Sequence, residues 1–526
     1  MGRFTRRDFI GTAGSAAASY LFAAATNAKP VQRDRSDTPV PPRLQVASFS
    51  CDVTPPIGHP LCGGVVKPVE AIADPLFVKG VILSDGKARY ALCALDWTEL
   101  HTGAYDLFRR KLANALAVNE LQVEVHCLHQ HDAPAADTDA QSLLDVTPSP
   151  PLTLNLQFME EVTDRVAAAA RAALERSQPF THIGYGKAQV EKFASNRRVP
   201  LKDGTIGVRY SCAKDPVLMA APEGLIDPWL RTISLFDCKE PLVRLRYYAT
   251  HPMSDYGHGR VSADIPGMAR SRLEREEGIP QIYFTGCGGN IAAGKYNDCS
   301  TEARDQLVER LYRGMRGAIA ATRKEAVREV SWKTTEVRFA LRAEPEFSEA
   351  YFRERVADPR AKPDERLKAA WALAWYDRLK VRPGVDLSCY RLGPVRILHL
   401  PGEAFVEYQL YAQSLRPNDF VAVVSYGEGG PGTFAPTLRS RREDTSRRGL
   451  SSARPAKRVS RPASSNCCAN GIGLPSQTLV AEGPRMPCGV SRDAIRVAVE
   501  SPFIPQIAAE SWARGTASGR GRFVMQ

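Results

Sequence analysis

Apolar and polar residues alternate with period two along several short stretches of this chain, and between them apolar positions recur at helical spacing. Alternation of this kind predicts β-strands, because successive side chains of a strand point to opposite faces. We therefore predict an α/β fold: mixed β-sheets flanked by helices in one large catalytic-type domain, followed by a disordered tail. Strands are expected at 77–83, 89–95, 123–128, 242–250 and 395–400, and helices at 103–116, 159–176 and 363–380.

Composition places the chain among soluble globular proteins. Its 526 residues, 44% of them hydrophobic, are enough to bury a sizeable core, and no internal apolar run reaches membrane-spanning length. The sequence shows no internal repeat and no phosphate-binding glycine loop. The twelve cysteines are scattered, so most are expected to be buried thiols, although Cys287 in a glycine-rich loop could neighbour a metal.

Metal-binding side chains follow three of the predicted strands. The strand at 123–128 runs into His129-Gln130-His131, and the period of two predicts that the two imidazoles share one face. His251 follows the strand at 242–250, and Glu403 follows the turn after the strand at 395–400. Two imidazoles and a carboxylate on three strand ends predict an open Zn²⁺ site with a free position for water or substrate.

Short motifs along the chain occur in the order expected of a known family. The sequence resembles the catalytic domain of neutral/alkaline, non-lysosomal ceramidases over about residues 44–432, and it is closer to the bacterial ceramidase-like branch than to characterised ceramidases. The motifs that carry the resemblance are CDVTPP (51–56), LHQHDAP (128–134), SNRR (195–198), IDPWL (226–230), ATHPMS (249–254), SADIPG (262–267), GCGGNIAAGKYND (286–298) and LPGEAF (400–405).

The resemblance implies a role for each candidate residue. It implies that His129, His251 and Glu403 hold Zn²⁺ together with a later tyrosine, and that His131 and Arg197 line the active site around the scissile amide. Ala292 stands where the family has a serine beside the metal, and alanine offers no nucleophilic or metal-directed oxygen. Hydrolysis of ceramide by this chain is therefore expected to be weak or absent.

Both ends of the chain look different from the domain between them. Residues 1–28 resemble a twin-arginine export signal, with Arg6-Arg7 ahead of a small-residue apolar stretch, and 29–43 is a proline-rich, charged linker. The expected location is therefore periplasmic or secreted. Residues 44–432 form the ceramidase-like metal-hydrolase domain, and 433–526 form a basic, low-complexity tail.

The tail carries +9 of the net charge of +12. Loss of one nucleotide just before codon 433 would explain it, because the restored frame can spell the tyrosine-led segment and the Gly-Gly-Tyr-Glu turn that bacterial relatives have there. We therefore interpret 433–526 as a frame-shifted translation. Thr433 then stands where the family's metal-binding tyrosine is expected, and its shorter hydroxyl should bind metal less well.

Two functions compete on this evidence. The first is an exported Zn²⁺-dependent hydrolase that cleaves an amide or related bond by metal-activated water, with His131 as general base or acid and Arg197 stabilising oxyanion charge. The second is a non-catalytic relative that binds a lipid or a glycan. The expected partner is a small-molecule or lipid substrate, with no nucleic acid; peripheral membrane contact and oligomeric state stay open.

Overall fold

Three five-stranded β-sheets form the framework of this chain. The computed structural model describes residues 44–339, 341, 344–430, 432–434 and 522–523. The first sheet has the order β6-β4-β3-β1-β8, the second β16-β14-β13-β9-β18, and the third β23-β21-β20-β19-β25. Their bounds are β1 Gln45–Asp52, β3 Phe77–Ser84, β4 Arg89–Leu95, β6 Val123–Cys127, β8 Gln178–Pro179; β9 His182–Gln189, β13 Trp229–Asp237, β14 Glu240–Tyr248, β16 Gln281–Thr285, β18 Arg323–Ala326; β19 Val330–Phe339, β20 Val385–Leu392, β21 Val395–His399, β23 Phe420–Val424 and β25 Arg522–Phe523.

The three sheets repeat one pattern of strand pairing. In each, three strands pair antiparallel in succession, as β1-β3-β4, β9-β13-β14 and β19-β20-β21 do. The chain then crosses over and adds a parallel fourth strand, which is β6, β16 or β23. A parallel pair needs a crossover connection, and a helix lies in each one. The repeat lies in the topology, which is why no repeat of residues was visible in the sequence.

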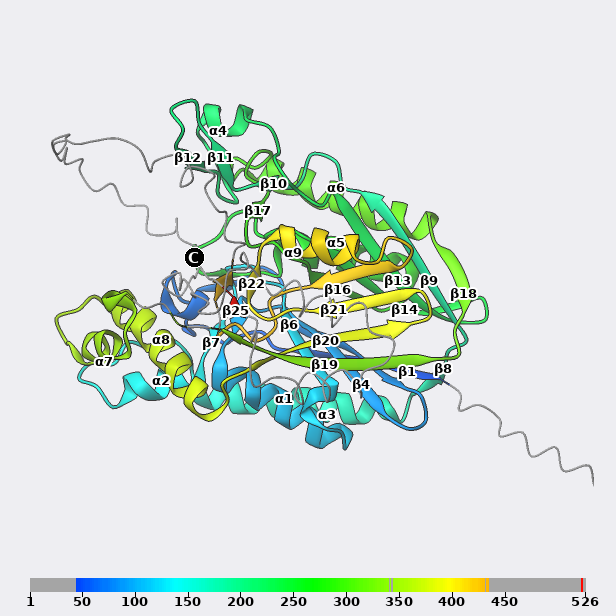
Figure 1. Cartoon of the computed structure of the whole chain (residues 1–526), viewed down its shortest axis with the longest axis horizontal. Helices are drawn as coiled ribbons and strands as arrows, with labels where there is room; N and C mark the ends of the chain where they lie inside the picture. Colours follow the sequence, from blue (N-terminus) through cyan, green and yellow to red (C-terminus); the bar gives the residue numbers. More distant parts are fainter. Residues whose placement is uncertain (1–43, 340, 342–343, 431, 435–521, 524–526) are drawn as a thin grey trace, which may run out of the picture. The chain divides into compact units, whose positions relative to one another are not determined.

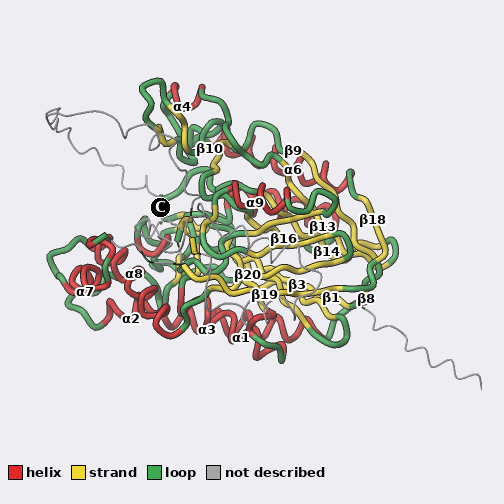
Figure 2. The backbone as a smooth tube through the Cα atoms, in the orientation of Figure 1, coloured by secondary structure: helices red, strands yellow, loops and turns green. Residues whose placement is uncertain are grey.

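The helices lie outside the sheets, and the sheets share a core. Val81 of the first sheet, Ile233 of the second and Ile397 of the third belong to one buried apolar cluster. In Figures 1 and 2, α1 and α3 lie below the strands and α6 lies above them. The helices are α1 Thr102–Leu116, α2 Thr138–Asp145, α3 Leu156–Leu174, α4 Pro216–Ala220, α5 Asp264–Glu277, α6 Thr301–Ala320, α7 Glu349–Ala357, α8 Pro363–Val381 and α9 Val406–Ser414.

Local sequence signals explain where several helices begin and end. The Asn155 side chain accepts a hydrogen bond from the Phe158 N–H at the start of α3, and Ser300 does the same for Ala303 at the start of α6. Helix α5 ends at Gly278, whose φ of +68° is a left-handed cap that glycine adopts without strain. Each of the three helices predicted from periodicity is present within a few residues of its expected bounds.

Five short two-stranded ribbons accompany the three sheets in the described part of the chain. Two of them matter most for the site: β5 pairs parallel with β7, and β22 pairs parallel with β24. The ribbons are β5 Glu99–Leu100 with β7 Ala135–Ala136, β22 Glu403–Ala404 with β24 Thr433–Phe434, β10 Ser195–Asn196 with β17 Ile291–Ala292, β11 Arg198–Pro200 with β12 Ile206–Val208, and β2 Ala71–Ile72 with β15 Arg260–Val261.

The predicted fold class is confirmed, since mixed sheets flanked by helices make up the described domain. The predicted export signal and linker lie outside the described residues, as does most of the tail. The tail was expected to be disordered, and its first two residues correct this expectation, because they form β24 beside Glu403–Ala404. No helix in the described part of the chain is long and apolar enough to cross a membrane.

Candidate metal centre

His129 and His131 lie in a loop, not on a strand. Strand β6 ends at Cys127, and His129 adopts a left-handed backbone conformation with φ of +72°. The argument from strand alternation was therefore wrong. The two rings nevertheless lie together, with centroids 5.2 Å apart, because the turn at His129 redirects the chain. A left-handed conformation at a non-glycine residue is strained, and such strain gathers at functional sites.

His129 and His251 are held in matching orientations by backbone carbonyls. Nδ1 of His129 lies 3.0 Å from the Thr98 carbonyl oxygen, and Nδ1 of His251 lies 2.7 Å from that of Gly288. A carbonyl can only accept a hydrogen bond, so Nδ1 carries the proton in both rings. Each Nε2 is then left with a lone pair, which is the state in which an imidazole binds a metal.

Glu403 brings a carboxylate to the same point. Its Oε1 lies 2.7 Å from Nε2 of His251 and 3.5 Å from Nε2 of His129. Burial alone would raise the pKa of Glu403, but His251, His129 and Arg197 lower it to about 2, so the group is an anion. The Nε2 lone pairs of His129 and His251 and the negative carboxylate of Glu403 thus converge in a buried space. Such an arrangement is unfavourable unless a positive charge lies between these groups. The donor set therefore fits a divalent cation.

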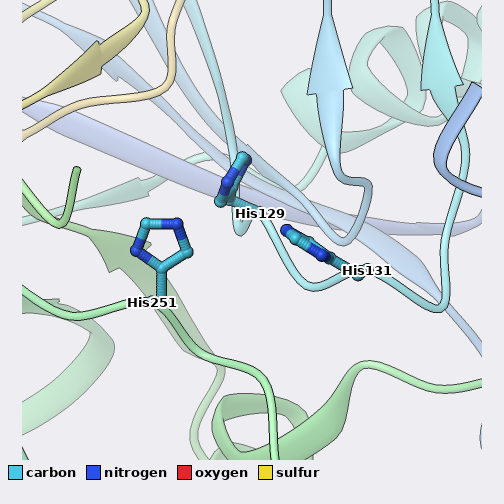
Figure 3. Close-up of side chains that lie close together, drawn as sticks. All are labelled: His129, His131 and His251. Atoms are coloured by element: carbon cyan, nitrogen blue, oxygen red, sulfur yellow. The ribbon is translucent and has the colours of Figure 1, made fainter. Parts of the chain in front are cut away.

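His131 completes a cluster of three buried imidazoles (Figure 3). One ring nitrogen of each of His129, His131 and His251 lies within 4.8 Å of the others, so these three could also hold a metal ion. Nε2 of His131 has no hydrogen-bond partner among the described residues. Burial, and then the neighbouring His129, His251 and Arg197, hold the pKa of His131 well below its ordinary value, so this ring is neutral.

Arg197 reaches the centre from the loop between β10 and β11. Its Nη1 lies 3.1 Å from Nε2 of His251 and 3.5 Å from the Gly289 carbonyl oxygen. Its guanidinium lies over the Tyr210 ring at 5.3 Å. The five residues predicted to form the site are thus brought together, while which of them bind metal and which act on substrate stays a prediction.

Ala292 is fully buried in β17 beside the site. It pairs with Ser195 of β10, and the Ser195 hydroxyl donates a hydrogen bond of 2.9 Å to the Ala292 carbonyl. Ser195 also accepts a hydrogen bond from the Lys295 N–H at 3.3 Å. This serine is therefore occupied within the wall of the site, and it does not replace the hydroxyl expected at position 292.

Tyr426 is a site residue that the sequence did not reveal. Its ring stacks on His129 with centroids 4.4 Å apart, its side chain is buried, and its φ of +60° is left-handed. The hydroxyl has no hydrogen-bond partner among the residues that the structure describes. Burial, and then the charge of Glu403, raises the pKa of Tyr426 well above its ordinary value. Its position just after an apolar strand was the signal that could have identified it.

Glu99 is a second missed residue, and it lies behind His129. Its Oε1 is 3.6 Å from Nδ1 of His129, and its Oε2 is 2.8 Å from Nε2 of His101. Cys287, considered as a metal neighbour, is instead buried in an apolar cluster, and burial raises the pKa of its thiol. It therefore stays a neutral packing residue.

The backbone at position 433 runs directly beside Glu403. The register of β22 and β24 pairs Glu403 with Thr433, and the Glu403 N–H donates to the Gly432 carbonyl at 3.1 Å. The backbone of residue 433 is thus a neighbour of the candidate ligand Glu403. The hypothesis that position 433 should hold a metal-binding tyrosine requires this proximity.

The fold described here is that of ceramidases. The structure of a ceramidase complexed with C2 aligns over 74% of this chain and 70% of its own, with a TM-score of 0.55 and 13% sequence identity. A neutral ceramidase from Pseudomonas aeruginosa aligns over 74% of this chain and 68% of its own, with a TM-score of 0.54 and 16% identity. The predicted fold resemblance is confirmed. No family model and no curated protein matches the sequence.

Proposed function

We propose that this chain is a zinc-dependent hydrolase of the ceramidase type that cleaves an amide or related bond. The observation that carries the proposal is the convergence of Nε2 of His129, Nε2 of His251 and Oε1 of Glu403, at 3.5 and 2.7 Å from the carboxylate oxygen. A Zn²⁺ ion held there would lower the pKa of a water molecule and polarise a substrate carbonyl. Tyr426, whose ring stacks on His129, is a candidate for a further oxygen donor.

His131 and Arg197 have the chemistry for the two remaining tasks. His131 is neutral and buried next to the ligands, so it can accept a proton from the attacking water and return it to the leaving nitrogen. Arg197 now contacts Nε2 of His251, whose lone pair cannot serve an arginine and a metal together. Metal binding would therefore release the guanidinium to stabilise the developing negative charge on the substrate oxygen.

The substrate is proposed to be an N-acyl amide, of which lipids are one class. The structural relatives are ceramidases, but Ala292 leaves the wall of the site without the hydroxyl that ceramide cleavage is expected to need. We therefore expect hydrolysis of short N-acyl amides and weak or absent hydrolysis of ceramide. Ceramidase activity equal to that of serine-bearing relatives, and lost in His131→Ala, would contradict this expectation.

The test is turnover by the purified, zinc-loaded chain. Release of amine from short N-acyl amides should depend on zinc and should disappear in His131→Ala. The matched control is His182→Ala, because His182 lies on β9 and bonds Thr181 away from the centre. The export proposal is tested separately, by fractionating cells that express the chain with and without Arg6-Arg7.

The competing proposal is a non-catalytic protein that keeps the fold to bind a lipid or a glycan. The observation in its favour is the buried alanine at position 292. A chain that binds zinc tightly but releases no amine from any N-acyl amide would establish this alternative over the hydrolase.

A further inference from the structure

Glu99 occupies in the first sheet the position that Glu403 occupies in the third. Each lies four residues after the end of its sheet's third strand, Leu95 in one case and His399 in the other. Each begins a two-residue strand that pairs parallel with a later ribbon strand, β5 with β7 and β22 with β24. A helix begins three residues later in both, α1 at Thr102 and α9 at Val406.

The fourth strands of the same two sheets show the same correspondence. His129 lies two residues after Cys127, the end of β6, and Tyr426 lies two residues after Val424, the end of β23. Both have left-handed backbones, with φ of +72° and +60°, and their rings stack on each other. The repeated topology therefore brings two carboxylates and two aromatic rings to one place. Glu99 and His129 take the positions after the third and fourth strands of the first sheet that Glu403 and Tyr426 take in the third sheet.

Glu99 lies on the Nδ1 side of the His129 ring, opposite the side that faces the candidate metal centre. Its carboxylate faces Nδ1 at 3.6 Å, whereas Glu403 faces Nε2 at 3.5 Å, so the ring lies between two carboxylates. Glu99 is only 3% exposed, and its second oxygen lies 2.8 Å from Nε2 of His101, an ion-pair distance. His101 is itself buried and stacks on Trp371 with ring centroids 5.3 Å apart. The carboxylate thus has a fixed position.

We propose that Glu99 and His101 form a positioning pair for the metal ligand His129; this inference rests on the proposed metal centre. The negative charge on the Nδ1 side supports the Nδ1 proton, strengthens Nε2 as a donor and fixes the orientation of the ring. His101 anchors the carboxylate and balances its charge in a site that water does not reach. Neither residue touches the substrate.

The experiment compares zinc affinity in Glu99→Gln and in a matched control, using competition with a chromophoric chelator. Glu99→Gln keeps the shape of the side chain and removes its charge, so zinc affinity should fall about 10- to 100-fold. The control is Glu124→Gln, because Glu124 is also a buried carboxylate of the first sheet, 3.8 Å from His126 and bonded by Ser388. Its zinc affinity should stay within about twofold of the unmodified chain, since the contacts of its carboxylate are with Ser388, Tyr105 and His126 and not with the candidate ligands.

A second readout separates positioning from folding. The visible absorption of bound Co²⁺ should change in band position for Glu99→Gln and stay unchanged for Glu124→Gln, because it reports the ligand geometry. His101→Gln should weaken zinc binding in the same direction, and the double variant should lose less than the sum of the two single losses. Should Glu99→Gln fail to fold, His101→Gln carries the same test alone.

The outcomes are distinguishable from those of the proposed function. If the unmodified chain binds zinc and Glu99→Gln binds it equally well with an unchanged Co²⁺ spectrum, the positioning role is wrong and the metal centre stands. If the unmodified chain binds no zinc, the metal centre is wrong and this inference falls with it. If Glu124→Gln weakens binding as much as Glu99→Gln, the effect belongs to buried charge in general and the positioning role is overturned.

Discussion

The first and third sheets follow the same path and end in different chemistry. At equivalent positions the first sheet provides Glu99 and His129, and the third provides Glu403 and Tyr426. In the first sheet the aromatic residue offers a lone pair to the centre and the carboxylate stands behind it. In the third the carboxylate itself faces the centre. The comparison teaches that the repeated backbone fixes where side chains arrive, while residue identity decides which of them can bind a metal.

The second sheet differs from both, because it contributes one imidazole and backbone carbonyls. His251 lies three residues after the end of β14, and the carbonyls of Gly288 and Ile291, which follow β16, fix its ring. Cys287 stands two residues after β16, at the place of His129 and Tyr426, yet it packs in an apolar cluster. Each of the three sheets therefore contributes at least one candidate metal donor: His129 from the first, His251 from the second and Glu403 from the third.

The largest expected effect comes from removing one of these donors. His129→Ala, His251→Ala and Glu403→Gln should each lower zinc affinity more than 100-fold, beyond the range for residues behind the ligands. Isothermal titration with zinc measures this, with His182→Ala as control. If Glu403→Gln binds zinc normally while His129→Ala does not, the third sheet supplies packing alone and the comparison of the two sheets fails.

The contact between the first and third sheets should also make the metal-free protein sensitive to acid. His126 of β6 stacks on His399 of β21, with ring centroids 5.3 Å apart. Burial lowers the pKa of His126 to about 4, and burial together with His126 lowers that of His399. Because the folded state binds fewer protons than the unfolded one, stability is lost as pH falls from 6.5 towards 4. For His126 alone the loss is roughly 3 kcal/mol.

Urea unfolding at several pH values between 7.5 and 4.5 checks this loss. His126→Gln should flatten the dependence of unfolding free energy on pH, while His258→Gln, at an exposed position paired with Asp255, should leave it unchanged. Glu124 and Arg109 also face His126, so Glu124→Gln is measured alongside to separate their influence. An unchanged slope in His126→Gln would show that other groups carry the acid sensitivity.

The sequence was sufficient for the parts of this molecule that depend on local patterns. Helix α3 is an example, because its buried apolar residues recur at helical spacing and Asn155 caps its start, so it is marked without reference to other segments. His251 and Glu403 could be predicted because they lie three and four residues after the ends of apolar strands. The resemblance in motif order added Arg197, which no periodicity indicates.

The remaining features depend on which strand ends meet, and a single sequence does not contain that information. Glu99 and Tyr426 also follow apolar strands, but that signal alone does not single them out, and they become site residues because the first and third sheets deliver them to one point. The repeat itself was invisible, because it conserves the order of pairing and not the residues. The alternation argument for His129 failed because the strand ends at Cys127 and the left-handed turn replaces its period.

A tyrosine at position 433 should strengthen the contribution of the third sheet. The backbone of Thr433 pairs with that of Glu403, so Thr433→Tyr adds a phenol at the residue whose backbone pairs with the candidate ligand. We expect zinc affinity to rise about tenfold, by the size of effects seen for groups that support metal ligands. Thr433→Phe is the matched control, because it adds the ring without the oxygen. Equal affinity in the two variants would show that position 433 does not supply a donor.

The smallest expected effect concerns Tyr426, whose ring stacks on that of His129, and it tests whether the Tyr426 hydroxyl binds the metal. The Tyr426 hydroxyl is buried without a hydrogen-bond partner among the described residues, and leaving such a group unpaired costs about 1 kcal/mol or more. Tyr426→Phe should therefore raise the unfolding free energy of the metal-free chain by about 1 kcal/mol. In the zinc-loaded chain the sign should reverse, because a hydroxyl that binds the ion would then be a bond that Tyr426→Phe removes.

Chemical unfolding with and without saturating zinc measures both signs on one variant. Tyr408→Phe is the control. Tyr408 lies in helix α9, which belongs to the crossover of the third sheet, and its side chain packs in an apolar cluster. It should respond equally in the two states. If Tyr426→Phe is stabilised equally with and without zinc, Tyr426 only packs against His129. Glu403 would then be the single donor that the third sheet contributes. The first and third sheets would share a backbone path, but the aromatic residue would bind the metal in the first sheet alone.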